Sequence, residues 1–101
     1  MPIIETVRYR LKEGISTDQA VSAWEESQSF AKAQKGFLGC KIAVNEEGEF
    51  LDLVEWESMA DAKAASANFD PGKFPELLGL VQALDESSMV MTHYTVTGST
   101  E

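Results

Sequence analysis

A short apolar strand that runs directly into a capped helix constrains this chain more than any other feature of its sequence. Residues 50–56 are rich in aromatic, aliphatic and β-branched side chains and predict a strand. Ser58 is followed three residues later by Asp61, the spacing of a helix N-cap in which the serine hydroxyl accepts a hydrogen bond from a free backbone N–H. The strand therefore ends at Trp56, just before a helix that returns over the sheet. We predict a ligand pocket at this junction.

The rest of the chain repeats this alternation of strands and helices. Period-two patterns predict the other strands, and a 3.6-residue period predicts the helices. Ser16 and Gln19 have the spacing of a capping box at the start of the first helix, and Gly36 is its expected end. Pro75 suits the first position of another short helix. In chain order we expect a strand at 3–11, a helix at 16–36, strands at 37–44 and 50–56, a helix from 58, a short helix reaching 84, and a last strand at 89–97.

This order of elements predicts an α+β fold on the ferredoxin-like, split βαβ plan. We expect a four-stranded antiparallel sheet with helices on one face, in a single domain at 1–98 followed by a tail at 99–101. The other face of the sheet would then be open. A monomer rarely exposes one contiguous apolar patch, so we predict that two copies pack sheet to sheet as a dimeric α/β barrel. By strand parity, the residues assigned to this open face are Ile4, Phe37, Met89 and Met91.

Composition narrows the classes of partner. The net charge is −9, from 17 acidic and 8 basic residues, which disfavours binding to nucleic-acid phosphates and to anionic membrane surfaces. No apolar run approaches the roughly 20 residues of a membrane span, and the N-terminus lacks the features of a signal peptide. The single cysteine, Cys40, excludes an internal disulfide and fits a reducing compartment. We therefore expect an acidic, cytoplasmic protein whose partners are a second copy of itself and a small-molecule ligand.

The sequence resembles the dimeric α/β-barrel superfamily, near the antibiotic-biosynthesis-monooxygenase-like domains. Three stretches carry the resemblance: residues 7–14 before the first capped helix, residues 36–39 at the start of the second strand, and residues 56–62 at the strand–helix junction. The likeness extends over essentially the whole chain. This superfamily includes monooxygenases without metal or flavin, heme-degrading enzymes, small-molecule isomerases and proteins of unknown role, so the resemblance implies a fold and leaves the function open.

Comparison with the functional residues of those relatives separates two of the activities. At the positions that heme-degrading relatives fill with Asn and Trp, this sequence has Val7 and Ala65, which argues against heme chemistry. Quinone-forming relatives use a polar residue and a Trp on the third strand, and Asp52 and Trp56 match that pair. Those relatives also use a Tyr or Arg from the covering helices, and the helices expected here contain neither.

Five residues are candidates for a site. Trp56, Tyr9 and Tyr94 are predicted to line a substrate pocket, although each could instead serve only for packing. Asp52 is the first choice for a catalytic proton acceptor, since burial raises the pKa of a carboxyl. His93 is the second choice because its unperturbed pKa lies near neutrality. A solvated Asp52 and a structural His93 are the alternatives.

The sequence predicts no metal and no cofactor. No second histidine and no partner for Cys40 supply the spacing of a zinc site. Two classes of function remain. One is a metal- and flavin-independent monooxygenase-like enzyme acting on a small aromatic or quinol-like metabolite. The other is a non-catalytic dimer of the same fold that binds a small molecule or takes part in a stress response.

Overall fold

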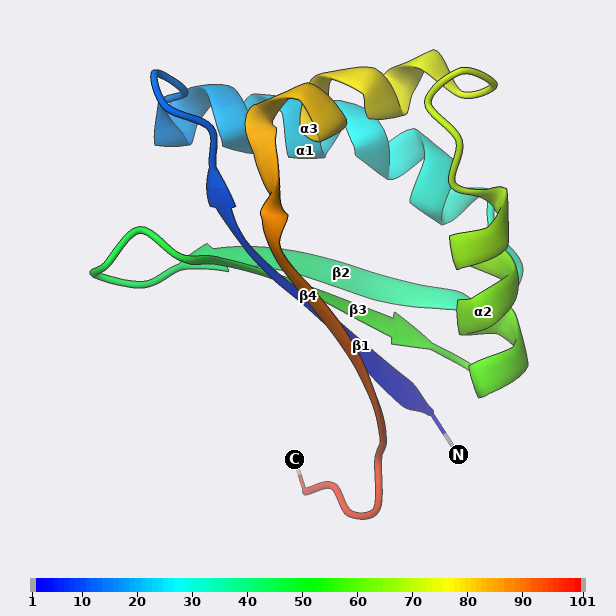
Figure 1. The fold of residues 1–101 in the computed structure, drawn as a ribbon. Coiled ribbons are helices and arrows are strands. Elements are labelled where there is room, and N and C mark those ends of the chain that lie inside the picture. The colour runs from blue at the N-terminus through cyan, green and yellow to red at the C-terminus, as the bar shows by residue number, and fades with distance from the viewer. Residues whose placement is uncertain (1, 101) are drawn as a thin grey trace.

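The computed structural model describes residues 2–100 as one four-stranded antiparallel sheet with helices on one face (Figure 1). The strand order is β2-β3-β1-β4, so the two central strands are β1 and β3. This arrangement confirms the predicted ferredoxin-like α+β fold. In chain order the elements are β1 (Ile3–Leu11), α1 (Thr17–Lys32), β2 (Phe37–Val44), β3 (Phe50–Trp56), α2 (Met59–Asn68), the 3-10 helix η1 (Pro75–Leu77), α3 (Leu78–Ala83) and β4 (Leu84–Thr95).

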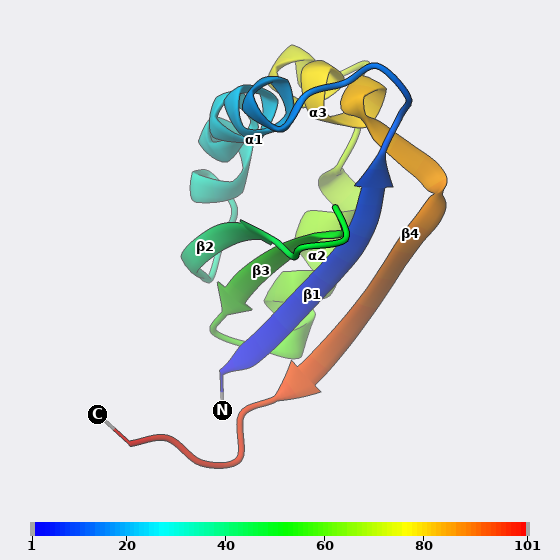
Figure 2. The same cartoon turned by 90° about the vertical axis from the view of Figure 1, so that its left-hand side faces the viewer.

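The helices form a layer over one face of a curved sheet (Figure 2). In both views α1 and α3 lie side by side, and α2 covers the end of the sheet where β3 finishes. The opposite face carries no helix among the described residues. The sheet therefore has a covered face and an open face.

Local sequence signals set where the two longer helices begin. Ser16 accepts a hydrogen bond from the backbone N–H of Gln19, while the Gln19 side chain accepts one from the backbone N–H of Ser16, which completes the predicted capping box. Ser58 accepts from the backbone N–H of Asp61 at 3.1 Å and caps α2. Both predicted caps are confirmed.

Gly36 connects α1 to β2 in a conformation that requires glycine. Its φ is +82°, which L side chains rarely adopt. A Cβ at this position would also overlap the carboxylate of Asp61 in the first turn of α2. The glycine therefore lets the α1–β2 connection and the start of α2 approach each other closely.

The register of β1 decides which side chains face the helices. Alternate residues Ile3, Glu5 and Tyr9 are buried on the covered face. The ring of Tyr9 stacks on that of Phe50 from β3, with centroids 5.7 Å apart. This contact belongs to one of two core clusters, and the other lies around Trp56 under α2.

The structure corrects the predicted contents of the open face. Met91 lies opposite Val7, so it and Met89 face the helices. Phe37 also faces them, because a register shift before Gly39 places it opposite Trp56, where the two rings meet edge to face at 5.8 Å. The last strand begins at Leu84 rather than at 89. A second register shift occurs in the pairing of β1 with β4, between Arg8 and Arg10 of β1.

The open face nonetheless carries several apolar side chains, which surround Thr6 and Arg8. Ile4 lies on this face, as predicted. The other members of the surface are the residues of β3 and β4 that pair with Ile4, Thr6 and Arg8. We call this surface the open-face patch; its apolar members are Ile4, Leu51, Leu53, Val90 and Tyr94.

Candidate functional site

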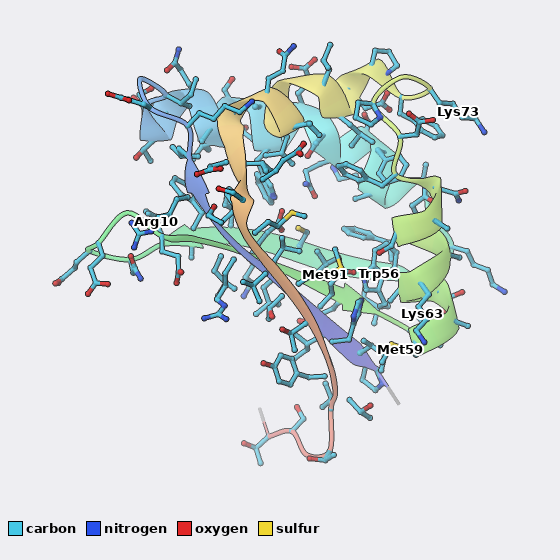
Figure 3. The ribbon with its side chains drawn as sticks, in the orientation of Figure 1. Arg10, Trp56, Met59, Lys63, Lys73 and Met91 are labelled. Atoms are coloured by element: carbon cyan, nitrogen blue, oxygen red, sulfur yellow. The ribbon has the colours of Figure 1, made fainter. Side chains whose placement is uncertain are left out.

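A cavity of about 250 Å³ lies between the sheet and the helices. Its size is near the lower end of the range typical of small-molecule pockets. Met89, Met91 and Phe69 line it and are also substantially exposed, so they mark its mouth. Figure 3 shows Met91 and Trp56 in the space between β4 and α2. The remaining lining residues are Glu5, Val7, Tyr9, Ser27, Gln28, Phe30, Ala31, Cys40, Asp52, Val54, Trp56, Ala65, Ser66, Leu77, Leu80 and Leu84.

Trp56 and Glu5 form one polar contact in the cavity wall. The indole Nε1–H donates to Oε1 of Glu5 at 2.9 Å, and both side chains are buried. Burial raises the pKa of Glu5 above its usual value, and the Trp56 hydrogen bond partly offsets this rise. The small side chains of Ala62 and Ala65 on α2 pack in the same cluster and leave room for the indole ring.

Asp52 and Cys40 form a second polar contact. The Cys40 thiol donates to Oδ1 of Asp52 at 3.0 Å across the β2–β3 pair. Burial raises the pKa of Asp52, and the thiol hydrogen bond lowers it by less. Burial, followed by the nearby Asp52 charge, raises the pKa of the Cys40 thiol, so this cysteine remains protonated and is a poor nucleophile.

Two further polar atoms near this pair are buried without a hydrogen-bond partner in the described part of the chain. They are the hydroxyl of Tyr9 and the indole Nε1 of Trp24. Burial, followed by the nearby Asp52 charge, raises the pKa of Tyr9 and keeps its phenol neutral. A buried polar group without a partner is costly, and a ligand atom could supply the missing hydrogen bond.

The five predicted site residues do not all reach the cavity. Asp52, Trp56 and Tyr9 line it together. His93 also lies on the covered face, and its Nε2 is 3.6 Å from Oε1 of Glu5, too far for a hydrogen bond but close enough for a charge interaction. Tyr94 points to the other side: it lies opposite Ile4 in the open-face patch and is 54% exposed. The prediction of Tyr94 as a pocket residue therefore does not agree with its position.

Glu5 is the residue that the sequence reasoning missed. The available signal was its position: Glu5 alternates with Ile3, Val7 and Tyr9 on one apolar strand face. A charged residue on such a face is rarely buried without a partner, so a polar partner could have been expected. The partner is Trp56, which is 51 residues away in sequence.

The site holds acids and hydrogen-bond donors but no ligand set for a metal. Within residues 2–100 there is no group of three or more His, Cys, Asp and Glu placed to hold a metal ion. The lining contains no Lys, Arg or His. Chemically, the arrangement can orient an aromatic ligand against Trp56 and accept protons at Asp52 and Glu5.

The fold is similar to that of solved structures described as oxygenases or antibiotic biosynthesis monooxygenases, which agrees with the fold that the resemblance implied. SnoaB, a cofactor-independent oxygenase from Streptomyces nogalater, superposes with a TM-score of 0.75 at 14% identity, over 97% of this chain and 95% of that one. A candidate antibiotic biosynthesis monooxygenase from Bordetella bronchiseptica gives 0.78 at 11% identity, over 95% and 97%.

A third neighbour is described as a dimer. It is a dimeric ferredoxin-like protein of unknown function from Thermobifida fusca, with a TM-score of 0.68 at 12% identity, over 95% of this chain and 92% of that one. The sequence itself matches no protein-family model and no curated protein. In the described part of the chain, no helix has both the length and the apolar content needed to cross a bilayer.

Proposed function

We propose that the protein is a cofactor-independent, monooxygenase-like enzyme that oxidises a small aromatic or quinol-like metabolite in the cavity between sheet and helices. The observation that carries this proposal is Asp52, a partly buried carboxyl in an apolar cavity lined also by Trp56 and Tyr9. The structural likeness to SnoaB, described as a cofactor-independent oxygenase, supports it.

In the proposed reaction Asp52 takes the proton from a ring hydroxyl of the substrate. Its raised pKa makes the carboxylate a stronger base than an exposed aspartate, which suits proton transfer from a phenol. The hydroxyl of Tyr9, which lacks a partner, donates to the phenolate oxygen as negative charge develops there.

The electrons come from the ring. The phenolate ring is electron-rich and reduces O₂; one oxygen atom becomes the new ring carbonyl, and the other leaves as water with the two displaced hydrogens. A phenol with a free ortho or para C–H is thereby converted into a quinone. The apolar lining holds the ring against Trp56 and limits the access of water.

Oxygen uptake with a naphthalenediol tests this function. With 1,5-dihydroxynaphthalene as the probe, we expect the wild-type protein to consume one O₂ per quinone formed, followed by an oxygen electrode and by quinone absorbance. Asp52→Asn should lower turnover on the order of 10²-fold or more. Glu46→Gln removes an exposed acid in the β2–β3 turn and should retain the full rate. Full activity in Asp52→Asn would exclude Asp52 as the proton acceptor.

The same experiment separates the enzyme from the non-catalytic alternative. Binding of the diol in the cavity without oxygen uptake above the buffer rate would favour a small-molecule-binding protein of the same fold. The contacts around Trp56 and Asp52 would then serve for recognition alone.

A homodimer is also part of this proposal. The open-face patch has Val90 and Tyr94 exposed and Leu53 half-buried on a sheet face where no helix lies among the described residues. Contiguous exposed apolar surface of this kind marks an interaction site, and a second copy of the same patch would cover it. The dimeric protein from Thermobifida fusca has the same fold and supports this arrangement.

A further inference from the structure

We infer that the cavity binds a hydroxyaryl amine in its ammonium form, with the cation at Glu5 and the ring hydroxyl between Asp52 and Tyr9. This inference deepens the proposed function by naming the substrate class, and it rests on that proposal in using the same cavity. Three observations lead to it: the row of polar groups, the absence of basic side chains from the lining, and the unused hydrogen-bonding capacity.

The polar groups form a row along the covered face. Glu5 pairs with Val54, Val7 pairs with Asp52, and Tyr9 pairs with Phe50. Asp52 on β3 is therefore level with Val7, midway between Glu5 and Tyr9. Measured along the strand direction, it is about 7 Å from the Cα of each of them. A ligand that lies along β1 meets a carboxyl at one end and a carboxyl with a phenol at the other.

The negative charge in this row is poorly compensated by the protein. No Lys or Arg lines the cavity. Arg8 lies on the open face, and Arg10 donates to the backbone carbonyl of Glu47 at the β2–β3 turn. Among residues 2–100 the recorded ionic contact of Glu5 is with His93 at 3.6 Å. A buried carboxyl at Glu5 and a partly buried one at Asp52, with so little basic charge nearby, favour a cationic ligand and oppose an anionic one.

Hydrogen-bonding capacity is left unused at both ends of the row. The indole N–H of Trp56 donates to Oε1 of Glu5, whereas Oε2 has no protein donor in the described part of the chain. Tyr9 is only 2% exposed, lines the cavity, and its hydroxyl has no partner there. An ammonium group donates at the first end, and a ring oxygen accepts at the second. The indole of Trp56 adds a favourable aromatic surface for a cation.

Three probes with the same phenol test the inference by calorimetric titration at pH 7. Tyramine carries an ammonium group, tyrosol a hydroxyl in its place, and 4-hydroxyphenylacetate a carboxylate. We expect tyramine to bind at least about tenfold more tightly than tyrosol, a difference of about 1.4 kcal/mol. The carboxylate should show no binding. The preference for tyramine should persist in 0.5 M NaCl, since a buried charge pair is screened less than an exposed one.

Variants assign the preference to Glu5. In Glu5→Gln, the preference for tyramine over tyrosol should be lost. Glu46→Gln makes the same change in net charge at an exposed turn and should keep the full preference. Equal binding of the amine and the alcohol by the wild-type protein, preferred binding of the carboxylate, or no binding of tyramine at millimolar concentration would each overturn the inference. These wild-type measurements remain decisive if Glu5→Gln does not fold.

Failure of this inference can be told apart from failure of the proposed function. Preferential binding of tyramine without oxygen uptake on any phenol would leave the ligand class standing and remove the oxygenase. Oxygen uptake on 1,5-dihydroxynaphthalene without a preference for the amine would remove the ligand class and leave the oxygenase.

Discussion

The indole N–H of Trp56 donates to the buried carboxyl of Glu5 at 2.9 Å and so links β3 to β1 inside the wall of the cavity. Each side chain satisfies a polar group of the other that would otherwise be buried without a partner. The bond holds a ring that lines the cavity and leaves Oε2 of Glu5 without a protein donor among residues 2–100. A single contact therefore contributes both to stability and to the shape of the candidate site.

Replacing Trp56 by Phe should lower the free energy of unfolding by about 1–3 kcal/mol. The substitution keeps an aromatic ring but removes the donor to a buried carboxyl. Urea denaturation of Trp56→Phe, Glu5→Leu and the double variant forms a double-mutant cycle, since Leu, unlike Gln, has no oxygen to accept the indole N–H. We expect the two effects to be non-additive, because the residues share one bond. Strictly additive effects would show that the bond does not contribute to stability.

Stability should fall as the pH rises above about 4. The pKa values of Glu5 and Asp52 are raised by burial, so the folded chain holds protons that the unfolded chain releases from about that pH upward. Wherever the folded state binds more protons, the free energy of unfolding decreases with increasing pH. The decrease ends above the folded-state pKa values.

Asp52→Asn should flatten this pH dependence. Urea midpoints of the wild type and Asp52→Asn, taken at intervals from pH 4 upward, should diverge with the wild type losing more stability. Glu46→Gln, which removes an exposed carboxyl, should follow the wild-type curve. Parallel curves for the wild type and Asp52→Asn would indicate that Asp52 titrates as it does in the unfolded chain.

Loss of the α2 cap should be measurable on its own. Ser58→Ala removes the acceptor for the backbone N–H of Asp61 and should destabilise the protein by roughly 0.5–2 kcal/mol with no change of fold. Ser66→Ala on the same helix is the matched control, since the Ser66 side chain makes no hydrogen bond within residues 2–100. A Ser58→Ala denaturation midpoint equal to that of the wild type would contradict the role of this cap.

The open-face patch should hold two copies together. Light scattering at micromolar protein should give twice the chain mass of 11.1 kDa. An interface of standard size, about 1,600 Å² in total, would be expected. Leu53→Glu introduces a charge at the centre of the patch and should yield the mass of one chain, whereas Glu46→Gln should not. A wild-type protein that scatters as a single chain would exclude the dimer.

Much of the fold could be predicted because its signals are local. Ser16 with Gln19, and Ser58 with Asp61, act over three residues, so the helix starts were identified correctly. The start of the last strand was not, because the helical period through Leu77 and Leu78 continues to Leu84, where pairing with Leu11 imposes a strand instead. A register shift explains the error at Phe37, since one extra residue reverses the side to which a strand residue points. The face of Met91 depends instead on its pairing with Val7, which the alternation along β4 alone does not show.

The candidate site was less accessible from sequence because its contacts are long-range. The pairing of Asp52 with Trp56 on one strand face follows from their spacing of four residues. The role of Glu5 depends on a partner 51 residues away, and no local pattern encodes that distance. Tyr94 was assigned by residue type, whereas its position depends on the pairing of β4 with β1.

The alternation of β1 has a consequence for how the protein can change over evolution. Glu5, Val7 and Tyr9 face the cavity, while the residues between them, Thr6 and Arg8, face outward. Substitutions at one parity would alter the proposed ligand site without touching the outer surface, and substitutions at the other would alter the proposed dimer interface without touching the cavity. A single inserted or deleted residue in this strand would exchange the two sets at once. Point substitutions can therefore adjust the two properties independently, whereas a change in the length of this strand would disrupt both.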